Sequence, residues 1–543
     1  MGFATEALAT GEVDMTKWLK SAGTLAMMSA VLWTTAATAE APKRGGELVM
    51  LSSQVPRHFN PAVQSGVATM IPGAQIFAML VRADADWKIH PYLAESWTVS
   101  DDGLTYTFKL RANARFHDGQ PITAEDVKFS IETQKANHPF KTSLGAVSAV
   151  ETPDAQTAVV KLSQPHPALL LAMSTSIVPI IPKHVYGDGQ DVKTHPRNVE
   201  NVVGSGPFKL AEYRQGEYIV LERNNDFFLD GRPYLDKIVV RIIKDATSRI
   251  IAMENGDGGI YPLLSSSRDI QRLQDDKDLV VTDEGYAAVG PINWLAFNTK
   301  KAPLDDPKVR QAIAYAVDRN FIIKALHRGV SKAAPGPIAP ESPFFHPEIA
   351  PYDLNLDKAN SLLDEAGKKR GADGVRFSLG VDYLPNSDEQ QKALAEYLKP
   401  QLKKIGIDVQ VRSSPDFPTW AKRVSSYDFD MTMDSVFNWG DPVIGVHRTY
   451  LCSNIVQGVI WSNTQQYCSP KVDELLNAAG KEPDEATRKD LYVQFQKIVA
   501  EDLPIYWINV LPYHTAYSKN LGNPPLTVWG MMSPLDETYW KQQ

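Results

Sequence analysis

Residues 94–110, with the sequence AESWTVSDDGLTYTFKL, and residues 116–130, FHDGQPITAEDVKFS, decide the fold of this chain. In the first run, apolar and polar residues alternate on both sides of Asp101-Asp102-Gly103, which is typical of two half-buried strands joined by a tight turn. In the second run, Thr123 stands at an N-cap position and Asp126 follows three residues later, as in a capping box. These residues predict an antiparallel hairpin followed by a capped helix.

The N-terminus has the pattern of a secretory signal peptide. Lys17 and Lys20 precede an apolar run over residues 22–33, and Ala37-Thr38-Ala39 offers a small-residue cleavage site before Glu40. The apolar run is too short to cross a membrane. We therefore expect cleavage before Glu40 and export of a soluble mature protein to the periplasm.

The composition is that of an ordinary globular protein, and it narrows the possible partners. The chain has 543 residues, of which 43% are hydrophobic and 22% charged, and its formal net charge is −8. Because the chain is acidic and has no basic tract, we expect no binding to nucleic acid. Its two cysteines are Cys452 and Cys468. Export to an oxidising compartment favours a disulfide between them, and the alternative is a pair of free buried thiols.

The order of predicted elements indicates an α/β protein of more than one domain. Predicted helices over 356–367 and 389–405 alternate with predicted strands over 377–383 and 407–411. Such alternation is typical of a parallel or mixed sheet covered by helices. The length of the chain favours two to four domains.

Several stretches closely resemble one family, the extracytoplasmic solute-binding proteins of oligopeptide, dipeptide and nickel ABC transporters. They are the run at 94–130, GSGPFKL at 204–210 and PLDDPKVRQAIAYAVDR at 303–319. The resemblance implies an α/β protein with two lobes joined by a hinge and an extra domain inserted into lobe I. It also implies that the lobes close around a solute and that an ABC permease in the inner membrane recognises the closed form.

The expected division of the chain follows from this resemblance. The expected parts are the signal peptide at 1–39, lobe I at 40–70, 201–297 and 506–543, the inserted domain at 71–200, and lobe II at 298–505. Two crossings, near 297 and 505, are expected to form the hinge. We expect the protein to be a monomer.

One segment of lobe II, YDFDMTMDSVFNWGDP at 427–442, is expected to carry ligand specificity. It resembles a motif that lines the cleft in this family, where peptide-binding members hold the ligand's α-amino group with an Asp about four residues before the Pro. That position is Asn438 here, and an amide brings no charge to an ammonium. Asp434 or Asp441 are the alternatives. Trp439 is expected to line the cleft, so that its replacement weakens binding without changing the melting temperature of the ligand-free protein.

Three more residues complete the candidate ligand site. Arg448 can hold a ligand carboxylate through a bidentate pair, and His447 can reach a metal chelate, as a His does in nickel-binding relatives. Trp294 is the third candidate contact. Because of Asn438, the expected ligand is neutral, blocked or anionic at the group that faces this residue. Peptide-like solutes, opine- or sugar-like conjugates and metal chelates remain open.

No motif of a catalytic site occurs in the sequence. It contains no Gly-x-Ser-x-Gly, no His-Glu-x-x-His and no Gly-x-Gly-x-x-Gly. We therefore expect a binding protein and not an enzyme, with no cofactor and no metal site of its own. Two rival classes remain, namely a periplasmic hydrolase and a peptide scavenger with no dedicated permease.

Overall fold

A computed structural model describes residues 42–542 apart from 43, 350–351 and 386–389. The predicted signal peptide and its cleavage before Glu40 lie outside the described residues. Within the described part, no helix is both long enough and apolar enough to cross a membrane.

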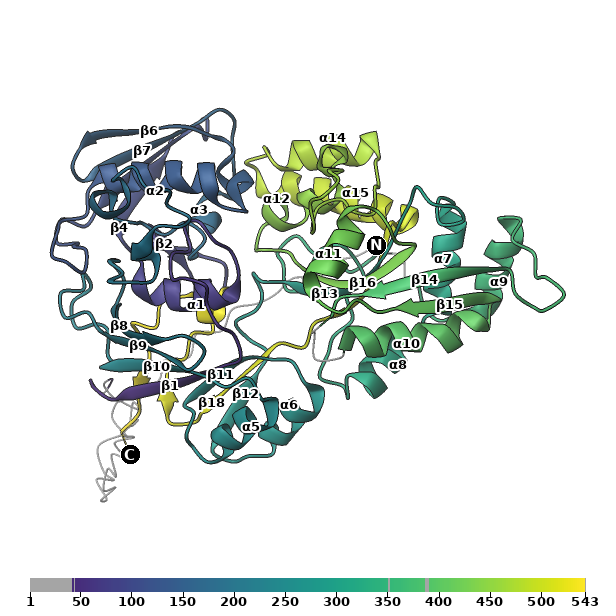
Figure 1. Cartoon of the computed structure of the whole chain (residues 1–543). Coiled ribbons are helices and arrows are strands. Elements are labelled where there is room, and N and C mark those ends of the chain that lie inside the picture. The colour runs from purple at the N-terminus through teal and green to yellow at the C-terminus, as the bar shows by residue number, and fades with distance from the viewer. Residues whose placement is uncertain (1–41, 43, 350–351, 386–389, 543) are drawn as a thin grey trace, which may run out of the picture. The chain divides into compact units, whose positions relative to one another are not determined.

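A seven-stranded mixed sheet forms the centre of the first lobe (Figure 1). Its parallel strands β1 and β10 pair along their whole length. Leu48 and Met50 of β1 are buried in the main core cluster, and Leu51 is buried in a second cluster with residues of α5 and α6. The order of the strands is β12 (Leu279–Thr282), β18 (His514–Ser518), β11 (Ile260–Leu264), β1 (Glu47–Ser52), β10 (Lys237–Ile242), β9 (Tyr218–Arg223) and β8 (Phe208–Arg214). The helices of this lobe are α1 (Val67–Ile76), α5 (Ala246–Glu254) and α6 (Ser267–Gln274).

The predicted hairpin and capped helix are confirmed. Strands β4 (Ala94–Val99) and β5 (Thr105–Leu110) pair in antiparallel fashion. Helix α2 (Ala124–Asn137) begins after Thr123, whose backbone N–H donates to Asp126 Oδ2 at 2.9 Å. The local sheet has the order β4, β5, β7 (Thr157–Leu162) and β6 (Val147–Asp154), and a small ribbon of β2 (Val81–Ala83) and β3 (Ile89–Pro91) lies before it in the chain.

The region predicted as an inserted domain shares its hydrophobic core with the first lobe. One continuous cluster of buried side chains contains Phe108 of β5 and Val127 of α2 as well as Leu48 of β1 and Ile238 of β10. The hairpin region therefore gains stability by packing on the large sheet, because burial of apolar surface is the main driving force of folding.

A five-stranded sheet forms the second lobe (Figure 1). Its order is β15 (Ile407–Arg412), β14 (Phe377–Tyr383), β16 (Met431–Phe437), β13 (Pro291–Phe297) and β17 (Ile505–Val510). Helix α7 (Pro307–Ala316) starts at the predicted N-cap, where Asp306 accepts a hydrogen bond from the backbone of Lys308. The other long helices are α9 (Leu356–Glu365), α10 (Gln390–Lys403), α11 (Phe417–Ser425), α14 (Pro470–Ala479) and α15 (Glu485–Asp502).

Short elements complete the described chain. They are η1 (Lys141–Leu144), α3 (Leu169–Ala172), α4 (Lys183–Tyr186), η2 (Pro196–Asn198), α8 (Arg319–Phe321), η3 (Ile322–Leu326), α12 (Pro442–Gly445), α13 (His447–Tyr450), η4 (Cys452–Asn454), β19 (Leu521–Gly522), η5 (Gly530–Met532) and β20 (Tyr539–Trp540).

The chain crosses between the two sheets at different points from those predicted. Strands β13 and β17 pair with each other, and β13 also pairs with β16. The prediction that residues 291–297 and 506–510 belong to lobe I is therefore wrong, and the crossings lie before Pro291 and after Val510. All seven residues of β13 are buried, and a strand buried on both faces carries no mark in its sequence of the sheet that it joins.

Candidate functional site

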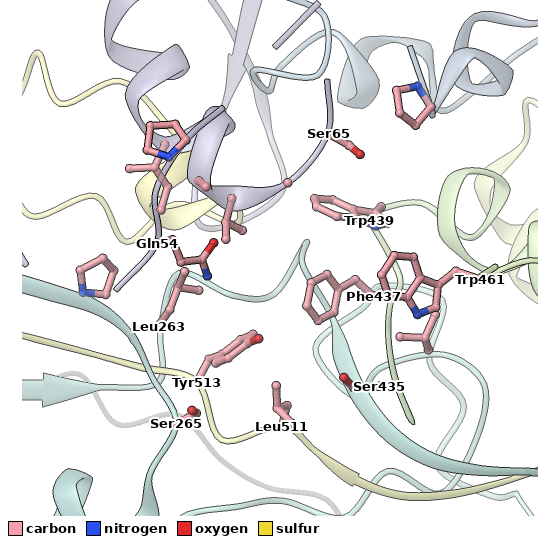
Figure 2. A pocket seen from close by; sticks show the side chains of 18 of the residues that line it. Gln54, Ser65, Leu263, Ser265, Ser435, Phe437, Trp439, Trp461, Leu511 and Tyr513 are labelled. Carbon is pink, nitrogen blue, oxygen red and sulfur yellow. The ribbon is translucent and has the colours of Figure 1, made fainter. Parts of the chain in front are cut away.

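A cavity of about 950 Å³ lies between the two lobes (Figure 2). Its volume is in the usual range for small-molecule sites. The residues labelled in Figure 2 line the cavity on three sides. The first lobe supplies Gln54, Ser65, Leu263 and Ser265, the second lobe supplies Ser435, Phe437, Trp439 and Trp461, and the connection after β17 supplies Leu511 and Tyr513.

Aromatic side chains of the cavity lining form what we call the aromatic wall (Phe140, Phe437, Trp439, Trp461 and Tyr513). Four of them contact one another in series, and Trp461 packs instead on Phe417 of α11. The ring centroids of Phe140 and Trp439 are 5.0 Å apart, those of Phe437 and Trp439 are 5.7 Å apart, and those of Phe437 and Tyr513 are 6.1 Å apart. Because Phe140 comes from the first lobe, the wall spans both lobes. It offers flat apolar surface on which a hydrophobic or aromatic group can stack.

Trp439 lies in the cavity lining, where the sequence analysis expected it. Its side chain is only 4% exposed and belongs to the core of the first lobe. Its φ of 52° is in the left-handed region, which is uncommon for a bulky residue. Truncating a buried Trp costs about 3–5 kcal/mol of stability. Because of this burial, we now expect replacement of Trp439 to lower the melting temperature of the ligand-free protein as well as to weaken binding.

Asn438 does not face the cavity. Its Oδ1 accepts a hydrogen bond from Ala339 N at 2.7 Å, and its Nδ2 donates to Pro337 O at 3.3 Å. The side chain is buried against the 337–339 loop, so it is not the group that a ligand amine would meet. The sequence motif predicts instead that Asn438 faces the ligand. The structure differs because a position in a motif fixes where the backbone lies and not where the side chain points.

Asp441 takes part in a buried ion pair outside the cavity lining. Its carboxylate accepts two hydrogen bonds from Arg488, at 2.6 and 2.8 Å, and it caps α12 by accepting from Val443 N at 2.9 Å. Burial by itself would raise the pKa of Asp441, but the charge and hydrogen bonds of Arg488 hold that pKa below its ordinary value. The geometry is that of a structural pair.

His447 and Trp294 also lie outside the cavity lining. His447 Nε2 is 3.0 Å from the hydroxyl of Tyr492, and burial lowers the pKa of His447 to about 3, which keeps the ring neutral. Trp294 lies in β13 and packs in the core of the second lobe. In the described ranges, no group of three or more His, Cys, Asp or Glu side chains is arranged to hold a metal ion.

Asp434 and Arg448 form the charged side of the aromatic wall. Asp434 is buried behind the wall, where it accepts hydrogen bonds from Ser435 N at 2.6 Å and from Trp461 Nε1 at 3.1 Å. Burial raises the pKa of Asp434 to about 7. Arg448 lines the cavity, and its Cζ lies 5.5 Å from the ring centroid of Phe140. Burial lowers the pKa of Arg448 to about 10, against the effect of Asp434, so the guanidinium stays charged at neutral pH.

Replacing Asp434 by asparagine is expected to flatten the pH dependence of stability. Because the carboxyl pKa is raised in the folded state, the stabilisation by its proton is present below the unfolded-state pKa near 3.9 and is lost as pH rises through about 7. The melting temperature of the unaltered protein should fall between pH 4 and pH 7, with Asp434 contributing up to about 4 kcal/mol over that range. Asp434→Asn should lose most of this slope, and parallel melting profiles for the two proteins would contradict the assignment.

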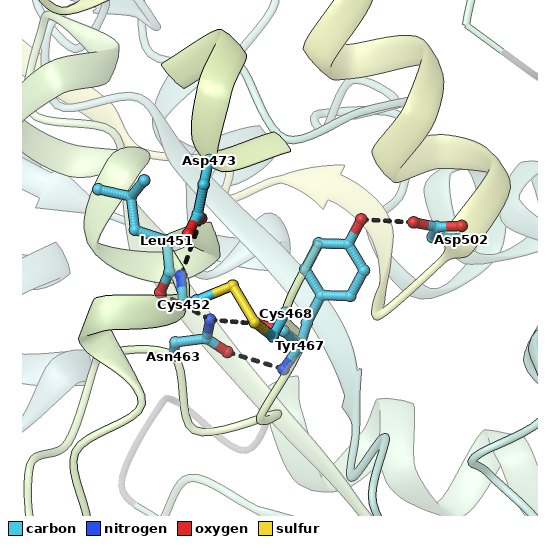
Figure 3. Close-up of a disulfide and its surroundings, with 7 residues drawn as sticks. All are labelled: Leu451, Cys452, Asn463, Tyr467, Cys468, Asp473 and Asp502. Atoms are coloured by element: carbon cyan, nitrogen blue, oxygen red, sulfur yellow. Dashed lines mark hydrogen bonds between the residues drawn. A yellow bond between two sulfur atoms is a disulfide. The ribbon is translucent and has the colours of Figure 1, made fainter. Parts of the chain in front are cut away.

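The predicted disulfide between Cys452 and Cys468 is confirmed (Figure 3). Asp473 accepts a hydrogen bond from Cys452 N at 2.9 Å, and Asn463 Nδ2 donates to Leu451 O at 3.0 Å. The loop that the disulfide closes supplies part of the cavity lining, namely Asn454, Val456, Val459, Ile460, Trp461 and Ser462. The disulfide-closed loop therefore forms part of one wall of the cavity.

The cavity thus brings together two of the seven predicted site residues, Trp439 and Arg448. Most of its other lining residues were not identified from the sequence. Phe140, Trp461 and Tyr513 stand in loops that are far apart in the chain, and no motif links them. Trp461 is the one Trp between residues 443 and 506, and nothing in its surrounding sequence marks it as a residue of the cleft.

Comparison with known proteins gives consistent matches over the chain. The sequence profile described as bacterial extracellular solute-binding proteins, family 5 Middle, matches residues 88–457. The dipeptide-binding protein of Escherichia coli K12 is 28% identical over 516 residues, which cover 90% of this chain and 92% of that protein. Heme-binding protein A of Haemophilus influenzae is 30% identical over 505 residues, covering 88% and 89%.

A solved structure gives a similar result. The binding protein AgaA of A. tumefaciens R10, in complex with agropinic acid, is 27% identical with a TM-score of 0.76, and the match covers 92% of this chain and 99% of that one. Matches of this extent include both lobes and the cavity between them.

Proposed function

Because the chain belongs to the family 5 bacterial extracellular solute-binding proteins, we propose that it is the periplasmic substrate-binding component of an ABC importer. It captures a small peptide-like solute between its lobes and delivers the solute to a permease in the inner membrane. The observation that carries the proposal is the cavity of about 950 Å³ whose lining comes from both lobes.

Capture by closure requires a ligand that contacts both lobes, since a ligand shifts a conformational equilibrium only through its different affinities for the two states. The contacts between the lobes support this mechanism. Gln390 Nε2 of the second lobe donates to Ser265 O of the first at 2.7 Å. Phe140 and Trp439 meet across the boundary in the aromatic wall. A ligand in the cavity adds to these contacts on both sides.

The relatives differ in the ligands that their names give, which are a dipeptide, heme and agropinic acid. The chemistry of this cavity is therefore the better guide. Its aromatic wall suits apolar side chains, and the hydroxyls and amides of Ser53, Gln54, Ser65 and Ser435 suit the polar groups of a peptide backbone. Opine- or sugar-like conjugates are the alternative, because the same hydroxyls can bind them. A metal chelate has less support, since the described lining contains no His, Asp or Glu.

Ser65→Trp is expected to block binding, because Ser65 lines the cavity and an indole there takes up ligand volume. Calorimetry against dipeptides, N-acetylated dipeptides, agropinic acid and a nickel–histidine chelate should give stoichiometric binding of at least one class. The affinity for that class should fall about 100-fold or more in Ser65→Trp.

Ser361→Trp is the matched control, because Ser361 is exposed on α9 and does not line the cavity. The bound solute should be recovered unchanged by mass spectrometry, and small-angle scattering should show a smaller radius of gyration with ligand. Cleavage of a bound peptide would instead indicate the hydrolase alternative. Equal binding by both Trp variants would move the site away from this cavity.

A further inference from the structure

The charge of the cavity lining has one sign. Among the lining residues in the described part of the chain, Arg249 and Arg448 are the charged ones, and no Asp, Glu or Lys occurs. Two guanidinium groups, with no carboxylate among the described lining residues, give this part of the cavity a positive potential, which favours an anion and disfavours a cation. The two arginines, however, are not equivalent.

Arg249 is held by the protein itself. Its Nε donates to the hydroxyl of Tyr261 at 2.8 Å, and its Nη1 donates to the carbonyls of Ile243 and Lys244 at 2.6 and 2.9 Å. The residue is 7% exposed. These bonds fix the guanidinium at the end of β10, where its role is to tie α5 to the sheet.

Arg448 makes fewer and longer hydrogen bonds. Its Nε donates to Gly445 O at 3.2 Å and its Nη2 to Phe437 O at 3.5 Å. A guanidinium has five N–H donors, so three remain without a partner among the described residues, and no carboxylate of that part lies within ion-pair distance. The nearby acid in the described part is Asp434, which makes no ion pair with Arg448 and whose pKa burial raises to about 7. Among the described residues, this partly buried cation therefore lacks a close counter-charge.

We propose that the ligand supplies that counter-charge: it is an amine-free or N-blocked carboxylate whose anionic group pairs with Arg448 and whose apolar body packs on the aromatic wall. The inference rests on the proposed function and specifies its substrate class. An N-acylated amino acid, an N-blocked peptide and an aryl or alkyl carboxylate all have this chemistry. A free α-ammonium has no carboxylate to meet in the described lining, and desolvating it there is unfavourable.

The position of Arg448 also links ligand charge to closure. Its guanidinium comes from α13 of the second lobe and lies over the ring of Phe140 from the first lobe. The cation–π contact with the ring helps to hold the guanidinium in place, and its N–H groups without a described partner can donate to a carboxylate in bidentate fashion. A carboxylate bound here therefore lies at the boundary of the lobes, where it stabilises the closed arrangement.

The test uses one ligand body in three charge forms: Leu-Phe, N-acetyl-Leu-Phe and N-acetyl-Leu-Phe amide. By calorimetry at pH 7, the N-acetylated acid should bind about 10- to 100-fold more tightly than either the zwitterion or the neutral amide. Arg448→Met should remove the difference between acid and amide. Arg448→Lys should retain part of it, because Lys keeps the charge but not the bidentate geometry.

Arg214→Met is the matched control, because Arg214 is an exposed arginine of β8 outside the cavity, and it should keep the full ratio. Melting temperatures establish that each variant is folded, and mass spectrometry identifies any solute released from the purified protein. Tight binding of Leu-Phe, a released solute with a free amine, or an acid-to-amide ratio that survives Arg448→Met would overturn this inference while leaving the transport function in place. If no probe binds and no solute is released, the proposed function itself fails.

Discussion

Replacing Asp441 by asparagine is expected to lower the free energy of unfolding by about 3–5 kcal/mol, because it leaves the buried guanidinium of Arg488 without its counter-charge. Both side chains are about 5% exposed, and the carboxylate makes two hydrogen bonds to Arg488, at 2.6 and 2.8 Å. The guanidinium also lies over the rings of Phe344 and Tyr492, with Cζ 4.7 and 5.4 Å from their centroids. Denaturant unfolding at pH 7 measures the loss.

Two further measurements separate this ion pair from general damage to the core. The double variant Asp441→Leu/Arg488→Met should recover much of the lost stability, since replacing a buried pair by apolar residues is often neutral or stabilising. The pKa of Asp441 is lowered in the folded state, so its stabilisation is present above the unfolded-state pKa near 3.9 and is lost as pH falls below that value. Asp441→Asn and the unaltered protein should therefore converge in acid. A loss below about 1 kcal/mol at pH 7 would show that the pair has little effect.

Removing the disulfide, as Cys452→Ser/Cys468→Ser, is expected to lower the free energy of unfolding by about 3 kcal/mol and also to weaken ligand binding. The stability effect follows from the entropy that a loop of about 15 residues regains in the unfolded chain. The binding effect follows from the structure, because six residues of this loop line the cavity. Unfolding curves and calorimetry on the same preparation measure both.

The hydrogen bonds beside the disulfide should keep the base of the loop in place after the disulfide is removed. Cys452 N still donates to Asp473, and Asn463 still donates to Leu451 O, so the loop should keep its base and lose order near Trp461. The unaltered protein treated with reductant should match the double serine variant in both measurements. Unchanged binding by the reduced protein would mean that the wall keeps its position without the covalent link.

Local structure in this protein could be predicted from the sequence because its signals are local. The hairpin at 94–110 is specified by alternation and by the Asp101-Asp102-Gly103 turn, and helix α7 by Asp306 and its following Pro. The membership of β13 could not be predicted in this way. Its residues are buried on both faces, and a strand of that kind is equally suited to the centre of either sheet.

The candidate site was predicted less well, for a different physical reason. A motif places the backbone of residues 434–441 near the cleft, but partners distant in sequence decide where each side chain points. Asp441 pairs with Arg488, which is 47 residues away, and Asn438 is fixed by a loop about 100 residues away. Arg448 was identified because a guanidinium near the motif is chemically suited to a carboxylate. The sequence did not show that Arg448 would have no carboxylate partner within ion-pair distance among the described residues.

The two connections between the lobes have a mechanical consequence. They leave the second sheet from adjacent antiparallel strands, since Ile292 of β13 pairs with Val510 of β17 and Leu511 N donates to Pro291 O at 2.9 Å. Two segments of the chain that are hydrogen-bonded side by side can bend together in one direction, but they resist twisting about their long axis. We therefore expect the lobes to move mainly by rotation about a single axis at the strand ends. Such a rotation would bring the same two outer surfaces into the same register at each closure, and the proposed membrane partner would then meet one fixed geometry.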